Sequence, residues 1–294
     1  METVMESRNE IKKRLQTEQR RLMIKKFFNN KLAVIGGTVT LIMVLLAIFA
    51  PLICPQGPLD MVVTDRLQAP SAGGYIFGSD TYGRDVFTRV LYGARVSLTI
   101  GASVALISMV LGMLIGLLAS YYRALDNVLM RICDGLSAIP STLLAIALMA
   151  MLGSGTTNLI ISLTVVSTPR LARIARSAAL VVREQTYIEA MRATGASSMR
   201  IIWRHIAPNI LSPVVVQASY IFANAIITEA ALSFLGVGVP IPDPSWGNIL
   251  NEGKAVIYKA WWMIVFPGIF TALTVLGLNV FGDGLRDVLD PHTN

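Results

Sequence analysis

Six long apolar stretches alternate with polar segments along this chain. They cover residues 32–53, about 97–120, 132–152, 158–178, 211–235 and about 261–282. The first contains 22 residues without a charge. As a helix it would be ~33 Å long, which exceeds the ~30 Å hydrocarbon core of a bilayer. The pattern therefore predicts an all-α membrane protein with six transmembrane helices.

The third and fourth stretches differ from the others because charged residues interrupt them. These residues are Asp134, Arg170, Arg173 and Arg176. Pro140 and Pro169 are expected to kink the same two helices, because proline lacks the amide hydrogen that an interior helical turn needs. We therefore expect the ends of these two spans to shift by several residues.

Composition supports a membrane protein, and the positions of the basic residues explain the net positive charge. Only 15% of residues are charged and the mean hydropathy is +0.61, whereas a soluble domain has about 25% charged residues. The net charge of +7 is also typical of proteins that bind nucleic acid. Here the basic residues lie beside the apolar stretches, so topology and anionic membrane lipid explain them and no nucleic-acid partner is expected.

The distribution of Lys and Arg predicts the orientation of the chain. If the N-terminus is cytoplasmic, nineteen of the 25 basic residues fall in segments on that side and six fall on the other. Cytoplasmic segments of membrane proteins carry the excess of Lys and Arg. Both termini are therefore predicted to be cytoplasmic.

A polar segment, residues 187–209, separates the fourth and fifth apolar stretches on the cytoplasmic side. Its sequence is YIEAMRATGASSMRIIWRHIAPN. Gly195, followed by an alanine and two serines, is typical of a helix end and a new helix N-cap. Two short helices are therefore expected to meet at Gly195.

The second of these short helices has an amphipathic pattern. Its apolar residues recur at helical spacing: Met199, Ile202, Trp203 and Ile206. Arg200 and Arg204 are expected on another face, and Pro208 is expected to close the unit. The pattern fits a helix pair resting on lipid headgroups and equally fits a docking surface for a cytoplasmic partner.

The segment resembles the cytoplasmic loop of permease subunits in binding-protein-dependent ABC importers. That family's signature is Glu-Ala-Ala, three residues, Gly, nine residues, then Ile-x-Leu-Pro. Four residues stand at matching positions: Glu189, Ala190, Gly195 and Pro208. Met191 replaces the second Ala, and His205 and Ala207 stand where Ile and Leu are usual. The resulting His-Ile-x-Pro-Asn looks like the form found in the peptide and nickel branch of the family.

Three further blocks extend the resemblance to the C-type permease of dipeptide and oligopeptide importers. They are GSDTYGRDVFTRVLYGARVSL, EAALSFLGVGVP with SWGNIL, and GDGLRDVLDP. With the loop they cover most of residues 32–291. The resemblance implies the type I ABC importer permease fold and a multi-pass location in a bacterial inner or plasma membrane. It gives the residues 77–98 no physical role.

The resemblance implies three parts and a set of contact residues. Residues 1–31 would be a cytoplasmic amphipathic tail, 32–95 the first transmembrane helix with an extracytoplasmic loop, and 96–291 a five-helix core with a cytoplasmic coupling loop at about 180–209. Coupling helices in this loop would sit in a cleft of an ATPase. The residues implied in that contact are Glu189, Ala190, Met191, Gly195, Arg200, Arg204 and Pro208.

The same resemblance implies the partners and the cargo. The chain has no G-x-x-x-x-G-K-[ST] phosphate loop, so ATP and Mg would be bound by two partner ATPase subunits and no cofactor by this chain. A second permease and an extracytoplasmic substrate-binding protein would complete the importer. Dipeptides or oligopeptides are the expected cargo, with nickel and glutathione as alternatives, because those importers share these blocks.

Two polar residues in the fifth apolar stretch are candidates for the translocation pathway. Glu229 would cost about 2.5 to 3.5 kcal/mol at mid-helix on insertion scales, so it needs a polar neighbour or water. It is interpreted either as a pathway residue or as a structural contact near the outer end of the helix. Asn224 is the second candidate. Gly112 and Gly116 form a G-x-x-x-G pair that predicts close packing of helices.

Other classes of protein are less compatible with the residues. His205 and His292 have no Cys, His or carboxylate at metal-ligand spacing, and no G-x-S-x-G or H-E-x-x-H occurs. We therefore expect neither a metal site nor an enzyme. Cys54 and Cys133 are predicted on opposite membrane faces and unpaired. An ATP-independent secondary transporter stays open, with Glu229 as its main ionisable candidate.

Overall fold

The structure, a computed structural model, describes residues 14, 17–18, 21–22 and 25–289. Within them the regular structure is helical, apart from one isolated bridge between Ser79 and Asp85. Most of the predicted tail lies outside the described residues, and residues 25–29 are helical. The all-α prediction is confirmed for the described part of the chain.

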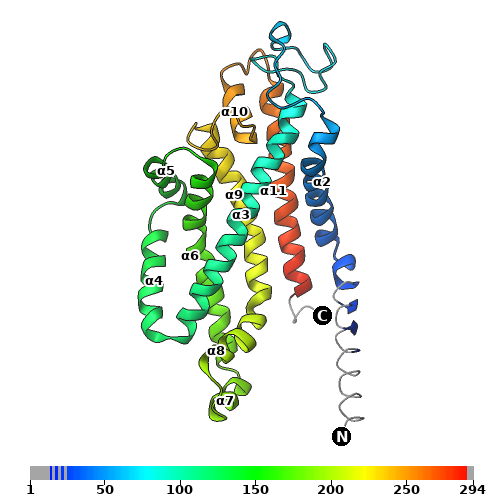
Figure 1. Cartoon of the computed structure of the whole chain (residues 1–294). Coiled ribbons are helices and arrows are strands. Elements are labelled where there is room, and N and C mark those ends of the chain that lie inside the picture. The colour runs from blue at the N-terminus through cyan, green and yellow to red at the C-terminus, as the bar shows by residue number, and fades with distance from the viewer. Residues whose placement is uncertain (1–13, 15–16, 19–20, 23–24, 290–294) are drawn as a thin grey trace.

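Long helices run lengthwise through an elongated bundle (Figure 1). They are α2 (Lys31–Ile53), α3 (Val86–Tyr121), α6 (Thr156–Arg183), α9 (Leu211–Phe234) and α11 (Trp262–Leu289). Helices α3, α6 and α9 contact one another, and α2 packs against α11. The main buried cluster lies between α3, α6 and α9.

Shorter helices occupy one side and the two ends of the bundle (Figure 1). They are the 3₁₀ turn η1 (Val63–Asp65), α4 (Arg123–Ser137), α5 (Ser141–Leu152), α7 (Thr186–Ala193), α8 (Ser198–Ile201) and α10 (Trp246–Lys254). Helices α4 and α5 pack against α6. Helix α10 lies at the end opposite α7 and α8.

Four segments are long and apolar enough to cross a membrane: Lys31–Ile53, Val86–Tyr121, Ser198–Phe234 and Trp262–Leu289. The predicted third span is wrong as a single helix, because α4 and α5 bend by 94° around Pro140 and count at most as one broken span. The predicted fourth span lies in α6, which contains four arginines. The six-helix count therefore stays a prediction.

Helix α3 begins earlier than the apolar pattern predicts. The sequence placed residues up to 96 in a loop, but α3 starts at Val86. The reason is Asp85, whose carboxylate accepts hydrogen bonds from the backbone N–H groups of Phe87 and Thr88 at 3.3 and 2.9 Å. An N-cap of this kind fixes a helix start whatever the hydropathy of the next turns.

Close packing of α3 on α6 depends on the predicted glycine pair. A Cβ on Gly116 would lie 2.6 Å from the Cβ of Ala175 and 2.7 Å from the carbonyl oxygen of Ala172. A Cβ on Gly112 would lie 2.7 Å from the Leu171 side chain. The packing role predicted for this pair is confirmed, because any larger residue would force the two helices apart.

The start of α2 and the end of α11 lie side by side, toward the end of the bundle that holds α7 and α8 (Figure 1). Asn30, which caps α2, donates from Nδ2 to Oδ2 of Asp287 in the last turns of α11 at 3.2 Å. The start of α2 and the end of α11 therefore lie on the same side, as the predicted topology requires.

A buried charge network at the opposite end gives residues 77–98 a structural role. Asp80 Oδ2 accepts from Arg84 Nε at 2.6 Å and from Arg89 Nη1 at 2.8 Å. Arg84 Nη2 reaches Glu252 Oε2 in α10 at 2.6 Å. Asp80, Arg84 and Arg89 are almost fully buried. The network, here called the outer clamp, fixes the loop and the start of α3 to α10.

Candidate functional site

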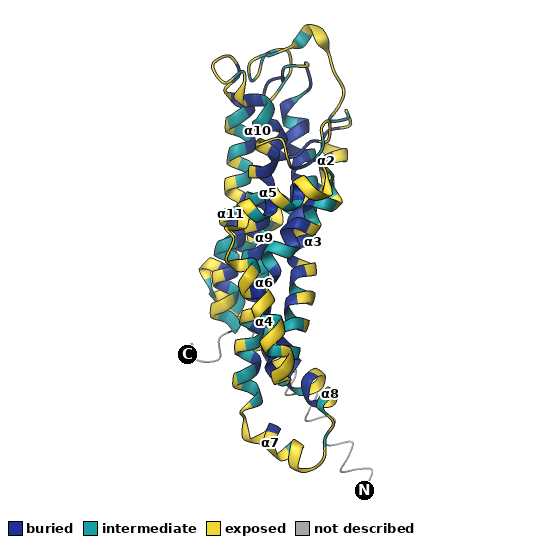
Figure 2. Cartoon of the chain, turned by 90° about the vertical axis from the view of Figure 1, so that its left-hand side faces the viewer, coloured by how far each residue is buried: buried dark blue, intermediate teal, exposed yellow. Residues whose placement is uncertain are grey.

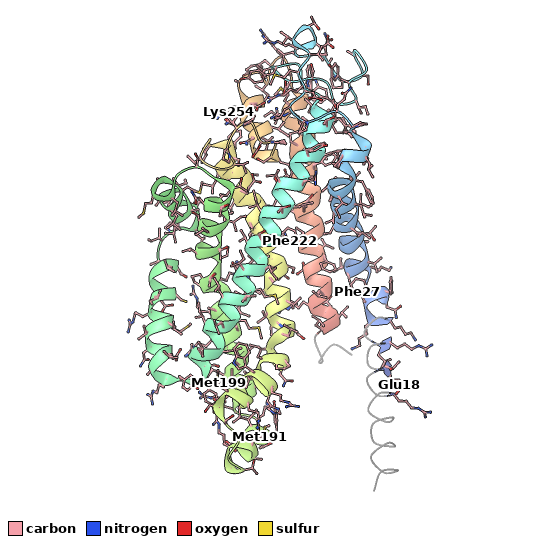
Figure 3. The ribbon with its side chains drawn as sticks, viewed as in Figure 1. Glu18, Phe27, Met191, Met199, Phe222 and Lys254 are labelled. Atoms are coloured by element: carbon pink, nitrogen blue, oxygen red, sulfur yellow. The ribbon has the colours of Figure 1, made fainter. Side chains whose placement is uncertain are left out.

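The elbow segment, residues 180–209, projects from the bundle at the end opposite α10 (Figures 1 and 2). As predicted, two short helices, α7 and α8, meet around Gly195. Figure 3 places Met191 and Met199 in this projection, far from Lys254 at the other end. Helix α7 is mostly exposed and held at few points, so its position depends on a small number of contacts.

Gly195 forms the turn of the elbow. Its φ is +79°, a left-handed conformation that costs L-residues about 1 to 2 kcal/mol. The N–H of Gly195 donates to the carbonyl of Arg192, and the N–H of Ala196 donates to that of Met191, each at 3.0 Å. These bonds form a glycine C-cap. A Cβ would meet nothing within 4 Å, so backbone conformation alone requires glycine here.

The inner face of the elbow segment is anchored to the bundle. Ile188 of α7 and Ile201, which ends α8, are fully buried and belong to the main core cluster. The guanidinium of Arg192 lies 5.4 Å from the ring centre of Tyr121 at the end of α3. These contacts connect the elbow segment to the end of α3 and to the core.

The outer face carries the residues that the sequence singled out. Exposed members are Glu189, Ala190, Gly195, Arg200, Arg204 and Pro208, and Met191 is half-buried. The predicted apolar face is wrong in part: Ile202 and Ile206 are buried, but Met199 and Trp203 are 59% and 46% exposed. The outer face thus combines charged and large apolar side chains.

Pro208 does not close the unit, contrary to the prediction. The π-helical turn η2 (Ile202–Ile206) and the 3₁₀ turn η3 (Ala207–Ile210) lead directly into α9. Proline is tolerated because it stands in the first positions of η3, where its missing N–H is not needed. Residues Ser198–Phe234 therefore form one helical rod from the elbow to the far side of the bundle.

Asn224 lines a polar cavity of about 230 Å³ at mid-height in the bundle. Phe222, labelled in Figure 3, marks this height on α9. The cavity lies between α5, α6 and α9, and its lining residues are Ser141, Leu163, Val166, Ser167, Arg170, Ile221, Asn224, Ala225 and Thr228. The sequence identified Asn224 as a candidate but did not foresee the contribution of α6.

Glu229 lies elsewhere and is fully buried. Its two carboxylate oxygens accept hydrogen bonds from Ser97 Oγ of α3 and Ser233 Oγ of α9, each at 2.8 Å. Ser233 Oγ in turn accepts from the N–H of Val239 at 3.0 Å. The structure therefore does not bring Glu229 and Asn224 together. The partners of Glu229 tie α3, α9 and the following loop to each other.

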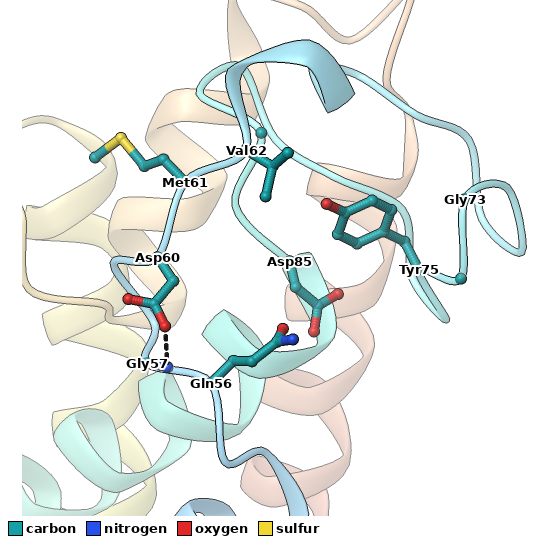
Figure 4. Close-up of a pocket in the computed structure, with 10 residues that line it drawn as sticks. Gln56, Gly57, Asp60, Met61, Val62, Gly73, Tyr75 and Asp85 are labelled. Atoms are coloured by element: carbon teal, nitrogen blue, oxygen red, sulfur yellow. Dashed lines mark hydrogen bonds between the residues drawn. The ribbon is translucent and has the colours of Figure 1, made fainter.

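A second cavity, of about 360 Å³, lies in the loop after α2 (Figure 4). Its two acidic residues are both engaged by backbone. Asp60 Oδ2 accepts from the N–H of Gly57 at 2.8 Å, and Asp85 caps α3. Tyr75 donates to Asp65 at 3.1 Å, and burial together with this bond raises the pKa of its hydroxyl. These contacts order the loop.

The part of the chain that the structure describes holds neither a candidate metal cluster nor a disulfide. No group of three or more His, Cys, Asp or Glu side chains there could hold a metal ion. His292 lies outside the described residues, as do Asp290 and Pro291. Cys54 and Cys133 are both free and buried.

Two family models match the chain. Residues 84–294 match the binding-protein-dependent transport system inner membrane component. Residues 18–70 match the N-terminal transmembrane domain of oligopeptide transport permease C. The two matches together cover the elbow segment, both candidate pathway residues, the first helix and the outer clamp apart from Asp80.

Relatives similar over nearly their full length carry related names. A putative peptide transport system permease of Brucella suis is 49% identical, with 93% of this chain and 90% of that protein covered. A dipeptide transport permease of Alkalihalophilus pseudofirmus is 44% identical, covering 91% and 88%. A glutathione transport permease of Pectobacterium atrosepticum is 41% identical, covering 91% and 89%.

A solved structure shares the fold. A chain of the MetNI methionine ABC transporter aligns with a TM-score of 0.58 and 22% identity, covering 69% of this chain and 97% of that one. The aligned fraction leaves out close to a third of the present chain.

Proposed function

The chain belongs to the family of binding-protein-dependent transport system inner membrane components, and we propose that its cargo is a dipeptide or oligopeptide. It is a multi-pass inner membrane protein and a permease subunit of an ABC importer. The observation that carries the peptide assignment is the identity of 44–49% over about nine-tenths of the chain to permeases named for peptide and dipeptide transport.

Glutathione is the second candidate cargo. It is favoured by the 41% identity to a permease named for glutathione transport. Glutathione is itself a tripeptide, so the two candidates share a backbone and terminal carboxylates. Nickel, the other alternative from the sequence, has no such relative to favour it among those described above.

We further propose six transmembrane spans with both termini in the cytoplasm. Helix α6 and the bent pair α4 and α5 would supply the two spans beyond the four apolar ones. Support comes from the pairing of Asn30 with Asp287 at the same end as the elbow segment, and from the excess of Lys and Arg on that side. The outer clamp would then lie outside, facing the binding protein.

The proposed role of the elbow segment is to dock a partner ATPase. Its outer face exposes both Met199 and Trp203, with Arg200 and Arg204 beside them. Such a mixture is typical of interface anchors, in which aromatic and arginine side chains contribute most of the binding energy. Resting on lipid headgroups is the alternative. Two ATPases, a second permease and a binding protein would complete the assembly, with ATP and Mg bound by the ATPases.

Transmission from the elbow to the pathway would follow the continuous rod Ser198–Phe234. At 1.5 Å per residue such a rod is about 55 Å long, and it carries Asn224 on its course. ATP-driven closure of the ATPases would push the elbow segment, tilt the rod and open the cavity alternately to each side. An ATP-independent secondary transporter would have no need of the exposed elbow.

The test is uptake by the complete importer in proteoliposomes. Labelled dipeptide should accumulate only with the binding protein present and ATP available to the ATPases. Unlabelled dipeptide should compete more strongly than glutathione if peptides are the cargo. Accumulation without ATPase subunits would contradict the proposal and favour a secondary transporter. Stronger competition by glutathione would replace the first cargo with the second.

A further inference from the structure

Four arginines lie on α6, and they differ in their partners. Arg183, the last residue of the helix, donates to the backbone carbonyl of Ser120 in α3. Arg176 Nε and Nη2 donate to the carboxylate of Asp126 in α4 at 2.5 and 2.6 Å. Arg173 donates to the hydroxyl of Ser137, also in α4. Arg170 has no hydrogen-bond or ion-pair partner among the described residues. Two of the four thus attach α4 to α6 and Arg183 bonds to α3, whereas Arg170 needs another explanation.

Arg170 lies midway along α6 and lines the polar cavity beside Asn224. In the isolated chain both residues are exposed. An arginine at the centre of a transmembrane helix is expensive, and such residues face a bundle interior or a water-filled cavity and mark substrate pathways. In the proposed six-span topology Arg170 would therefore face the pathway shared with the second permease, and not lipid.

The cavity is suited to an anion. No acidic side chain is among the nine described residues that line it, so nothing there neutralises Arg170. Asn224 has no side-chain partner among the described residues, and Ser141 and Ser167 also line the cavity. Guanidinium binds carboxylates through two parallel hydrogen bonds, and amide and hydroxyl groups can supply further donors.

We propose that Arg170 binds the carboxylate of the peptide as it crosses the membrane, with Asn224 as a second donor. This inference rests on the proposed peptide cargo. Every linear peptide ends in a carboxylate, whereas its side chains vary, so the site would accept peptides of many sequences. A transport site must also release its cargo. A single exposed arginine therefore suits it better than a closed pocket that surrounds the carboxylate of the peptide.

The first test compares two cargos in the reconstituted importer. One is a dipeptide with a free carboxylate and the other is its C-terminal amide, chosen so that the binding protein holds both with equal affinity. Arg170→Gln should lower uptake of the free acid about tenfold, the loss expected for one charged hydrogen-bonding partner, and leave the amide unchanged. Arg170→Lys should retain part of the uptake. The matched control Arg173→Gln should not distinguish the cargos.

The second test needs no transport. In a chain with Cys54→Ser and Cys133→Ser, the thiol of Asn224→Cys should react faster with a sulfonate-bearing methanethiosulfonate than with a trimethylammonium one. That preference should fall several-fold when Arg170→Gln is added, because a neighbouring positive charge is lost. If the cargo is not a peptide, neither the dipeptide nor its amide would be taken up, but the preference of Asn224→Cys for the sulfonate reagent would persist.

Three results would overturn the inference. One is an equal loss of uptake for acid and amide in Arg170→Gln, which would indicate a structural contact or an ion pair with the second permease. Another is unchanged uptake of both cargos. The third is an absent charge preference, or no reaction, at Asn224→Cys, which would mean that the cavity holds no accessible positive field.

Discussion

Arg89 and Glu252 lie 163 positions apart in the chain, yet Arg89 Nη2 donates to Glu252 Oε1 at 3.0 Å. Through this contact the start of α3 is held to α10, and the loop between α2 and α3 is held by Asp80 and Arg84 to the same pair. The outer clamp therefore acts as one unit. Removing the charge of any one member leaves the buried charges of the others unbalanced.

Glu252→Gln should destabilise the protein strongly. Loss of this carboxylate leaves Asp80 alone to neutralise two buried guanidinium groups, and breaking a buried ion pair typically costs about 3 to 5 kcal/mol. The thermal unfolding midpoint in detergent should fall by several degrees. Glu184→Gln, at an exposed position, is the matched control and should unfold like the parent chain. Equal midpoints for both variants would mean that the clamp does not stabilise the fold.

Gly116→Ala should separate α3 from α6. The added Cβ would lie 2.6 Å from that of Ala175, so the thermal midpoint should fall. Gly135→Ala makes the same change in α4 where a Cβ meets nothing within 4 Å. Removing a helical glycine there should stabilise the chain by up to about 1 kcal/mol. This explanation of the packing is wrong if Gly116→Ala and Gly135→Ala shift the thermal unfolding midpoint in the same direction.

Substitutions at Gly195 should follow backbone conformation and not side-chain size. Gly195→Ala should weaken coupling, since φ of +79° costs an alanine about 1 to 2 kcal/mol. Gly195→Pro should abolish it, because proline cannot adopt this φ and loses the N–H that binds Arg192. Asparagine tolerates the left-handed region, so Gly195→Asn should transport nearly normally. The measurement is ATP-dependent uptake at equal amounts of inserted protein.

Glu229→Gln should leave uptake near that of the parent chain. Glutamine can still hydrogen-bond Ser97 and Ser233, which are partners of Glu229. Glu229→Leu should lower both stability and uptake, because it removes the acceptor of both buried hydroxyl groups. A large loss of uptake in the glutamine variant, with normal stability, would instead assign the charge of Glu229 to the pathway.

Local chemistry made part of this structure predictable. The glycine at 195 and the cap residues after it indicate an elbow, because a left-handed turn and a new N-cap depend on neighbouring residues only. The pair Gly112 and Gly116 likewise indicates close packing. The elbow and the close packing were both predicted correctly, because each depends on residues only a few positions apart.

The remaining features depend on contacts between distant segments. Nothing near Arg89 indicates that its partner is Glu252, so the outer clamp was missed. Periodicity placed Met199 and Trp203 on one apolar face with Ile202, but only the neighbouring helices determine which of these are covered. From hydropathy, Arg170 only weakened the prediction of the fourth span. The structure distinguishes it from Arg173 and Arg176, because those two bond to α4 whereas Arg170 lines the polar cavity.

The measurement that tests the central claim most directly is the composition of the complex around this chain. The tagged protein would be purified in mild detergent from its native membrane, and the proteins that co-elute in comparable amount would be identified by mass spectrometry. We predict a second permease and ATPase subunits, and loss of the ATPase subunits in Gly195→Pro. A homo-oligomer that still transports peptides without any ATPase would contradict the account.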